Sequence, residues 1–183
     1  MSKVKSAELF AKKKHAGMTR KDKKTPYSDH LEAVVNRLKS IGISDENVLC
    51  AGWLHDTIED TDTSFDDLFE QFGREVAILV SSLSKDTSLR KKEREKLYVK
   101  QLKSSPLDAK IIKLCDISAN LSDLKSPGLS KSKKLRHAKQ KRHYLNVIKN
   151  DLISNKSKFP KIQNIVESIN VILIRHKQRP VTF

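Results

Sequence analysis

The chain of 183 residues is poor in cysteine, glycine, proline and aromatic side chains, and it has no long apolar run. Its two cysteines, Cys50 and Cys115, lie in apolar helical contexts without zinc-type spacing, which predicts buried, reduced thiols and no disulfide. Five glycines, five prolines and the lack of sustained β-branched alternation argue against a sheet protein. No stretch approaches the roughly 20 apolar residues of a membrane span, and residues 1–5 lead into a charged helix rather than a signal peptide. We therefore expect a soluble, cytoplasmic protein with no membrane partner.

Acidic residues are also in deficit. Lysine and arginine number 37 against 22 aspartate and glutamate, which gives a formal charge of +15. This excess attracts polyanions, but nucleic acid, an acidic membrane surface and a phosphorylated small molecule are all compatible with it. A solvated lysine-rich surface without a partner is equally compatible, so the charge alone does not identify a ligand.

What the chain does contain is apolar residues at spacings of three and four, which predict an all-α fold. The breaks at residues 104–106 and 126–128 are too short for interdomain linkers, so residues 1–183 are expected to form one compact domain. Ser28 or Asp29 is expected to cap the second helix, after a loop over residues 16–27 that is crowded with cations. We expect a bundle of about eight to ten helices, over residues 4–15, 28–41, 45–60, 65–72, 74–83, 89–102, 106–124, 131–152 and 159–175.

The most informative segment is residues 55–60, which read His-Asp-Thr-Ile-Glu-Asp directly after the apolar run at residues 51–54. Such charge at the end of a buried face costs free energy unless a metal or a partner balances it. We therefore interpret this segment as a functional site that closes the third helix.

Two imidazoles and two carboxylates from three distant segments can converge on one metal: His30, His55, Asp56 and Asp116. This mixed nitrogen and oxygen set suits manganese, iron, cobalt or zinc, and the absence of thiolates argues against a structural zinc or iron–sulfur site. A divalent ion in such a set supplies hydroxide at neutral pH and neutralises phosphoryl oxygens. Glu59 and Asp60 fall one turn further on, close enough to orient the water or move its proton. The pattern predicts hydrolysis of phosphate esters.

His30, His55, Asp56 and Asp116 resemble the four-ligand pattern of the HD phosphohydrolase superfamily. Three longer segments, residues 14–30, 54–61 and 113–120, are similar in order and separation to the hydrolase domain of RelA/SpoT-type alarmone enzymes. A stand-alone domain of this length looks like the small alarmone hydrolases.

This resemblance implies a pyrophosphohydrolase that removes the 3′-diphosphate from the stringent-response nucleotides guanosine tetra- or pentaphosphate (ppGpp, pppGpp), giving GDP or GTP and pyrophosphate. It implies one manganese ion, Mn²⁺ or another transition metal, bound by the four residues named above. By matching position, Glu59 and Asp60 would act on the attacking water. Substrate contacts would come from Arg20 against the base, Lys21 on phosphates and Asn120 on the nucleoside.

The third motif departs from the family pattern. Asp116 is followed by Ile117 where the family has arginine, Ser118 and Ala119 replace a bulkier pair, and Asp123 stands where a short polar residue is common. These changes either repack the helix or reshape the nucleoside pocket and relax the preference for guanine.

Two alternatives to guanosine alarmone hydrolysis remain at this stage. One is an HD enzyme that acts on another nucleotide, such as an adenosine alarmone (ppApp type) or NADPH. The other is an inactive domain that binds nucleotides or nucleic acid, although the complete set of ligands and acids makes nucleic acid the less expected partner. The sequence does not indicate the oligomeric state. Surface charge or ordinary packing, rather than ligand binding, is expected for Lys85, Lys91, Arg136, Arg142 and Tyr144.

Overall fold

The computed structural model describes residues 1–125 and 128–183, so residues 126–127 of the second expected break lie outside the described residues. In the described part of the chain there are nine α-helices, and the only β pairing there is one isolated bridge between Thr19 and Pro26. The all-α prediction and the expected number of helices are confirmed. The helices are α1 (Lys3–Lys14), α2 (Tyr27–Ser40), α3 (Glu46–Leu54), α4 (Thr57–Asp60), α5 (Phe65–Leu83), α6 (Lys91–Ser104), α7 (Leu107–Ser122), α8 (Lys131–Ser154) and α9 (Ile162–Arg175), with short 3₁₀ turns η1 (Asp123–Lys125) and η2 (Lys156–Lys158).

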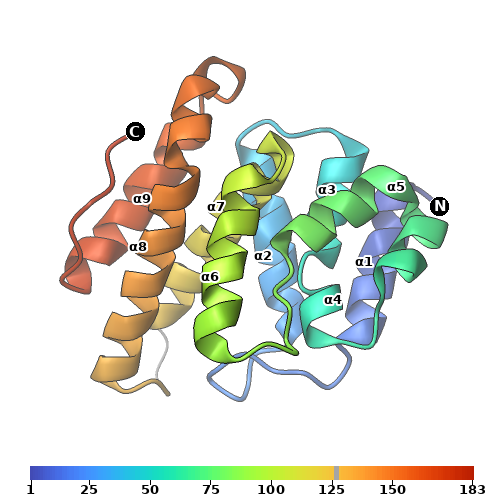
Figure 1. Cartoon of the computed structure of the whole chain (residues 1–183), viewed down its shortest axis with the longest axis horizontal. Coiled ribbons are helices and arrows are strands. Elements are labelled where there is room, and N and C mark those ends of the chain that lie inside the picture. Colours follow the sequence, from blue (N-terminus) through green and yellow to red (C-terminus); the bar gives the residue numbers. More distant parts are fainter. Residues whose placement is uncertain (126–127) are drawn as a thin grey trace.

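Helix α7 is the centre of the fold, with α2 on one side and α8 and α9 on the other (Figure 1). Most of its residues are buried, and these include the charged side chains of Lys113 and Asp116. A helix that is apolar all round is normally a core helix, so polar groups on it need partners inside the protein. The topology therefore carries Asp116 into the middle of the molecule.

Helix α2 places His30 in its first turn. Its buried residues Leu31, Val34, Val35 and Leu38 follow the spacing of a single apolar stripe. The predicted cap at Ser28 or Asp29 is wrong, because the helix begins at Tyr27 after Pro26. The backbone N–H of Tyr27 donates to the carbonyl oxygen of Met18 at 2.9 Å, beside the Thr19–Pro26 bridge, so the loop itself fixes the helix start.

Both cysteines are free and buried, as predicted. Burial raises the pKa of Cys50 to about 11 and also raises the pKa of Cys115. No helix in the described ranges is both long and apolar enough to pass through a bilayer.

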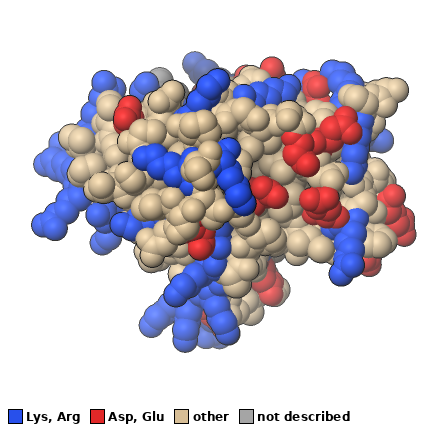
Figure 2. Space-filling model, turned by 90° about the horizontal axis from the view of Figure 1, so that it is seen from above, with Lys and Arg blue, Asp and Glu red and all other residues tan. Residues whose placement is uncertain are grey.

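Surface charge is unevenly distributed. Figure 2 shows lysine and arginine crowded at the end of the molecule that α8 and α9 form, whereas acidic side chains gather toward the opposite end. The basic excess is therefore concentrated on the C-terminal helices.

Helix α5 is bent at Gly73, which has φ 81° and ψ 167° between two helical segments. The sequence predicts a break at this residue, and the structure confirms it. Ser64 and Asp67 form a reciprocal capping box at the start of the same helix.

We expect Gly73→Ala to lower the free energy of unfolding by about 1–3 kcal/mol, because that backbone region is almost restricted to glycine. No atom lies within 4 Å of the position of an added Cβ, so the cost would be conformational rather than steric. Urea denaturation measures the change, and Gln71→Ala, exposed on the same helix, serves as the control with little expected effect. Equal stability of the two variants would contradict this account of the bend.

Candidate active site

Three helices bring four predicted ligands together. His30 comes from α2, His55 and Asp56 from the junction of α3 and α4, and Asp116 from α7. His55 Nε2 lies 3.1 Å from Asp56 Oδ2 and 3.8 Å from Asp116 Oδ1. His30 Nε2 lies 3.6 Å and 3.4 Å from the same two oxygens. The side chains of His30, His55 and Asp116 are no more than 3% exposed, so these donor atoms surround a point inside the protein.

The hydrogen bonding of the imidazole nitrogens indicates which kind of ligand fits between these side chains. Nδ1 of His55 lies 2.8 Å from the carbonyl oxygen of Gly52, and since a carbonyl can only accept, Nδ1 carries the proton. When the ring is neutral, as a metal ligand must be, the lone pair of Nε2 therefore faces the carboxylates. Nε2 of both histidines is buried without a hydrogen-bond partner. Unpartnered nitrogen lone pairs beside two carboxylates fit a divalent cation, and the histidine–carbonyl bond is typical support for a metal ligand.

Charge keeps both carboxylates ionised. Burial would raise the pKa of Asp56, but His55 and His30, when their rings are protonated, hold it well below its usual range. Burial also opposes ionisation of Asp116, and Lys113 and then Lys141 hold its pKa down. Lys113 Nζ lies 2.8 Å and Lys141 Nζ 3.6 Å from Asp116 Oδ2, which leaves Oδ1 directed at the histidines.

The expectation that residues 56–60 close the third helix is wrong. Helix α3 ends at Leu54, and a separate turn, α4, begins at Thr57. Two side chains take carbonyl oxygens near the end of α3: the His55 ring binds that of Gly52, and the Thr57 hydroxyl donates to that of Leu54 at 2.7 Å. The break turns His55 and Asp56 toward the same point.

Glu59 and Asp60 lie beside the ligand cluster on α4. Glu59 accepts the backbone N–H of Lys85 at 3.1 Å, and burial raises its pKa. Burial, and then the charge of Asp56, raise the pKa of Asp60. Carboxylates with raised pKa values are better placed to accept a proton near neutral pH.

Tyr27 is a site residue that the sequence analysis did not single out. Its hydroxyl lies 2.7 Å from Asp56 Oδ2 and 2.9 Å from Asp60 Oδ2, so it links the ligand cluster to the acidic pair. Its ring stacks on His15 with centroids 4.9 Å apart and meets His30 edge-on. Its position three residues before His30, on the same face of α2, is the signal that could have identified it.

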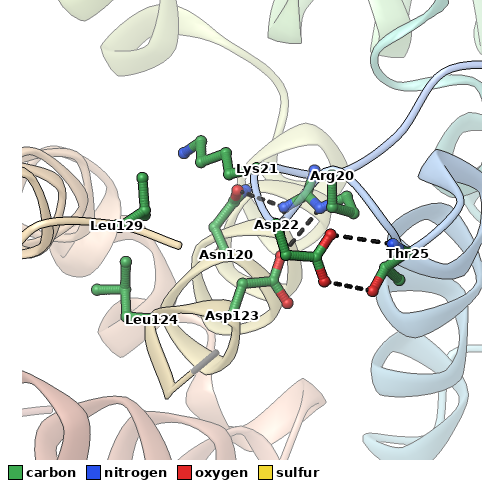
Figure 3. A pocket seen from close by; sticks show the side chains of 8 residues that line it. All are labelled: Arg20, Lys21, Asp22, Thr25, Asn120, Asp123, Leu124 and Leu129. Carbon is green, nitrogen blue, oxygen red and sulfur yellow. Dashed lines mark hydrogen bonds and ion pairs between the residues drawn. The ribbon is translucent and has the colours of Figure 1, made fainter. Parts of the chain in front are cut away.

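Arg20, Lys21 and Asn120 lie together at the mouth of the site. The Arg20 guanidinium donates to Asp123 Oδ2 from Nε at 2.9 Å and to Asn120 Oδ1 from Nη2 at 3.0 Å (Figure 3). It also lies over the Tyr27 ring, 5.1 Å from the centroid. Asp123 therefore binds Arg20, which explains an acid at this position of the third motif.

A cavity of about 230 Å³ joins the two groups of residues. Lys85, Lys113 and Lys141 line it together with Lys21, so four amines face the same space as Asp56 and Asp116. Lys85 is thus not the surface charge that the sequence suggested. Lys141 was not singled out either, because it lies in an exposed-looking basic tract with no local pattern. Burial lowers its pKa to about 8 despite the nearby Asp116.

The residues that depart from the family pattern in the third motif, Ile117, Ser118 and Ala119, do not face the metal cavity. Ile117 and Ala119 are buried in the core, and neither lines this cavity. Ser118 accepts a hydrogen bond from Arg37 at 3.1 Å. Of the two effects considered for these changes, repacking of the helix is the one that the structure supports.

A family model described as an HD domain matches residues 7–145. The chain belongs to the HD-domain family. Two curated relatives, guanosine-3′,5′-bis(diphosphate) 3′-pyrophosphohydrolase MESH1 of Drosophila melanogaster and of Homo sapiens, are each 44% identical to this HD-domain chain over 117 residues. These matches cover 63% of this chain and 65% of each relative, so the chain spans less than two thirds of their length.

A solved structure gives a fuller match. It is described as a metazoan orthologue of SpoT that hydrolyses ppGpp, and it aligns with a TM-score of 0.80 at 31% identity. The alignment covers 92% of this chain and 94% of that one. The resemblance of this HD-domain chain to the RelA/SpoT group is confirmed.

We expect Mn²⁺ to raise the thermal midpoint of the protein, because a cation would pair with the unpartnered imidazole nitrogens and neutralise the carboxylates of Asp56 and Asp116. At about 100 times the Kd, the gain is about 2.7 kcal/mol, or ~5–10 °C for a chain of this size. His55→Ala and Asp116→Asn should abolish the increase in a thermal shift titration. His143→Ala, which removes an exposed histidine on α8, should retain it. The same increase in all three variants would place metal binding elsewhere.

Proposed function

We propose that this HD-domain protein is a metal-dependent pyrophosphohydrolase that removes the 3′-diphosphate from guanosine tetra- or pentaphosphate. The observation that carries the proposal is the convergence of two imidazoles and two ionised carboxylates on one buried point, beside a cavity lined by four lysines. The relatives named above carry this activity in their descriptions. Hydrolysis would break the bond between the ribose 3′ oxygen and phosphorus, and water would supply the hydroxyl and the proton of the products.

The metal would be held by His30, His55, Asp56 and Asp116. Nitrogen and oxygen donors without thiolate suit manganese, and we propose Mn²⁺ as the resident ion. When bound, such an ion supplies Lewis acidity, which acidifies water and neutralises phosphoryl charge.

The acidic pair on α4 would manage the proton of the attacking water. Glu59 and Asp60 have raised pKa values and lie one turn from the ligands, so either carboxylate can take up that proton and later release it. The Tyr27 hydroxyl fixes Asp60 relative to Asp56. We propose that Tyr27 holds the orientation of Asp60 relative to Asp56 and does not exchange the proton of the attacking water itself.

The substrate's phosphates would lie among the amines of the cavity. Lys21 is exposed, and among the described residues its Nζ has one side-chain neighbour within hydrogen-bond distance, His137 Nδ1 at 3.4 Å. Desolvation and then the charge of Arg20 lower the pKa of Lys21, and a phosphate would offset both effects. Asn120 and Arg20 would contact the nucleoside, with Arg20 oriented by Asp123. The selection of guanine over adenine rests on these residues and is the less constrained part of the proposal.

The decisive experiment is an assay of manganese-loaded protein against guanosine and adenosine alarmones and NADPH, with products identified by mass. We expect GDP and pyrophosphate from guanosine tetraphosphate. His55→Ala and Asp60→Asn should lower kcat by ~100-fold or more, the usual contribution of such groups. Asp66→Asn, an exposed change at the start of α5, is the control.

Full activity in either site variant would contradict the assigned roles. Turnover of NADPH or of an adenosine alarmone alone would keep the reaction class but change the substrate. Salt-sensitive RNA binding without any hydrolysis in manganese would favour the non-catalytic alternative that the basic surface suggests.

We expect Asp123→Asn to raise KM about tenfold, a cost of about 1.4 kcal/mol, and to leave kcat within about twofold. The amide cannot neutralise Arg20 and accepts less strongly, so the guanidinium loses its fixed orientation. Steady-state kinetics measure both constants. Asp151→Asn is the matched control, because it breaks the Lys110–Asp151 ion pair outside the cavity at 2.6 Å. A fall in kcat with unchanged KM would contradict a positioning role in substrate binding.

A further inference from the structure

A second, larger cleft lies on the other side of α7. It has a volume of about 580 Å³ and is lined by residues of α2, α7, η1 and α9. Ser118 and Ser122 of α7 line it. Each serine comes two residues after a residue of the metal site, Asp116 or Asn120, and therefore lies about 200° around the helix from it. None of the residues that line the metal cavity lines this cleft. The two spaces are therefore separate.

We call this second space the rear cleft and the metal cavity of about 230 Å³ the front cavity. The residues that line the rear cleft include cations but no acids. Arg37, Lys125 and Arg175 contribute three positive charges, four serines and one asparagine contribute neutral polar groups, and no lining residue is acidic. One wall is aliphatic and comes from α9, with Ile165, Ile172 and the exposed Val171.

Arg37 carries the argument because it is half-buried and held in place by neutral groups alone. Its Nε donates to Ser118 Oγ and its Nη2 to Ser122 Oγ, both at 3.1 Å, while Nη1 donates to the carbonyl oxygen of Ala33 at 2.8 Å. Within residues 1–125 and 128–183, no carboxylate forms an ion pair with it. Burial lowers the pKa of Arg37, as expected for a desolvated charge that is not neutralised.

Three more deeply buried cations, whose side chains are no more than 9% exposed, each have an acidic partner. Arg20 binds Asp123 at 2.5 Å, Lys110 binds Asp151 at 2.6 Å and Lys113 binds Asp116 at 2.8 Å. A desolvated charge without a counterion is unfavourable, and an anionic ligand would supply the missing charge. Lys21, which is exposed, also has no ion pair with a carboxylate within the described residues, and it lines the cavity where a phosphate is expected.

We propose that the rear cleft binds a small phosphorylated molecule. Its phosphate would lie among Arg37, Lys125 and Arg175, where guanidinium forks and serine hydroxyls can donate to several oxygens, and its organic part would contact the aliphatic wall of α9. Three cations that line one cleft suit a multiply charged phosphate better than a single carboxylate. The volume lies within the usual range for small-molecule sites. This proposal does not depend on the hydrolytic function of the front cavity.

The test maps binding on the intact protein by ¹⁵N NMR, with inorganic phosphate, adenosine monophosphate and phosphate-free adenosine as probes. Chelator is present, so no turnover is needed. We expect phosphate and adenosine monophosphate to shift the amide signals of residues 118–125 and 164–175. Adenosine monophosphate should bind more tightly than phosphate because of the aliphatic wall, and adenosine alone should cause little change.

The variant Lys125→Gln/Arg175→Gln changes two exposed side chains and should raise the Kd at the rear cleft about tenfold, without altering shifts at the front cavity. Lys131→Gln/Lys139→Gln removes the same charge from exposed positions of α8 and is the matched control. Arg37→Gln should weaken binding further. The proposal is overturned if shifts are confined to the front cavity, or if the cleft variant and its control bind phosphate equally. Failure of the hydrolase assay would leave these results unaffected.

Discussion

The structure depends on the burial of one carboxylate, that of Asp116, in the middle of the central helix. A charge in that position requires compensation from every side, and each of its two oxygens has a different set of partners. Oδ2 is held by the amines of Lys113 and Lys141, whereas Oδ1 accepts the side-chain amide of Asn120 and faces the imidazoles of His30 and His55. Helices α2, α3 and α8 are therefore tied to α7 by electrostatics as well as by apolar packing.

Close packing of α3 against α2 is a precondition for this arrangement. Gly52 allows it, because a Cβ at that position would lie 2.7 Å from Leu38 Cδ1 and 3.2 Å from Val35 Cγ2. Its carbonyl oxygen accepts the His55 ring, and the rings of His30 and His55 then lie 5.3 Å apart between centroids. One glycine thus combines close helix approach with the orientation of a ligand. The His55 ring and the Thr57 hydroxyl also bind carbonyl oxygens of the last turn of α3, so the site residues are tied to the point where this helix ends.

Much of the fold could be predicted from the sequence, because apolar periodicity and caps are local signals. The convergence of His30, His55, Asp56 and Asp116 could also be predicted, because each residue alone has an ordinary structural explanation but together they match one four-ligand pattern. The supporting residues could not. Arg20 and Asp123 are far apart in sequence, and nothing near either residue indicates the ion pair. Lys85 and Lys141 look like ordinary surface lysines until the fold places them over the cavity. Local patterns identify groups that are costly to bury, whereas the groups that compensate them are determined by tertiary packing.

This distinction also explains how the net charge of +15 should be interpreted. Most of the basic side chains that crowd the end formed by α8 and α9 in Figure 2 are in contact with water, where a charge is stable without a partner. Such residues carry little information about a ligand. A half-buried cation is different, because it has lost hydration and must recover that free energy from a neighbour. The deeply buried Arg20, Lys110 and Lys113 recover it from aspartates, while within the described residues the half-buried Arg37 donates to the neutral hydroxyls of Ser118 and Ser122. Arg37 also lines a cleft together with two further cations, so its charge is the one that the proposed phosphate site would use, whereas the solvated remainder needs no ligand to be stable.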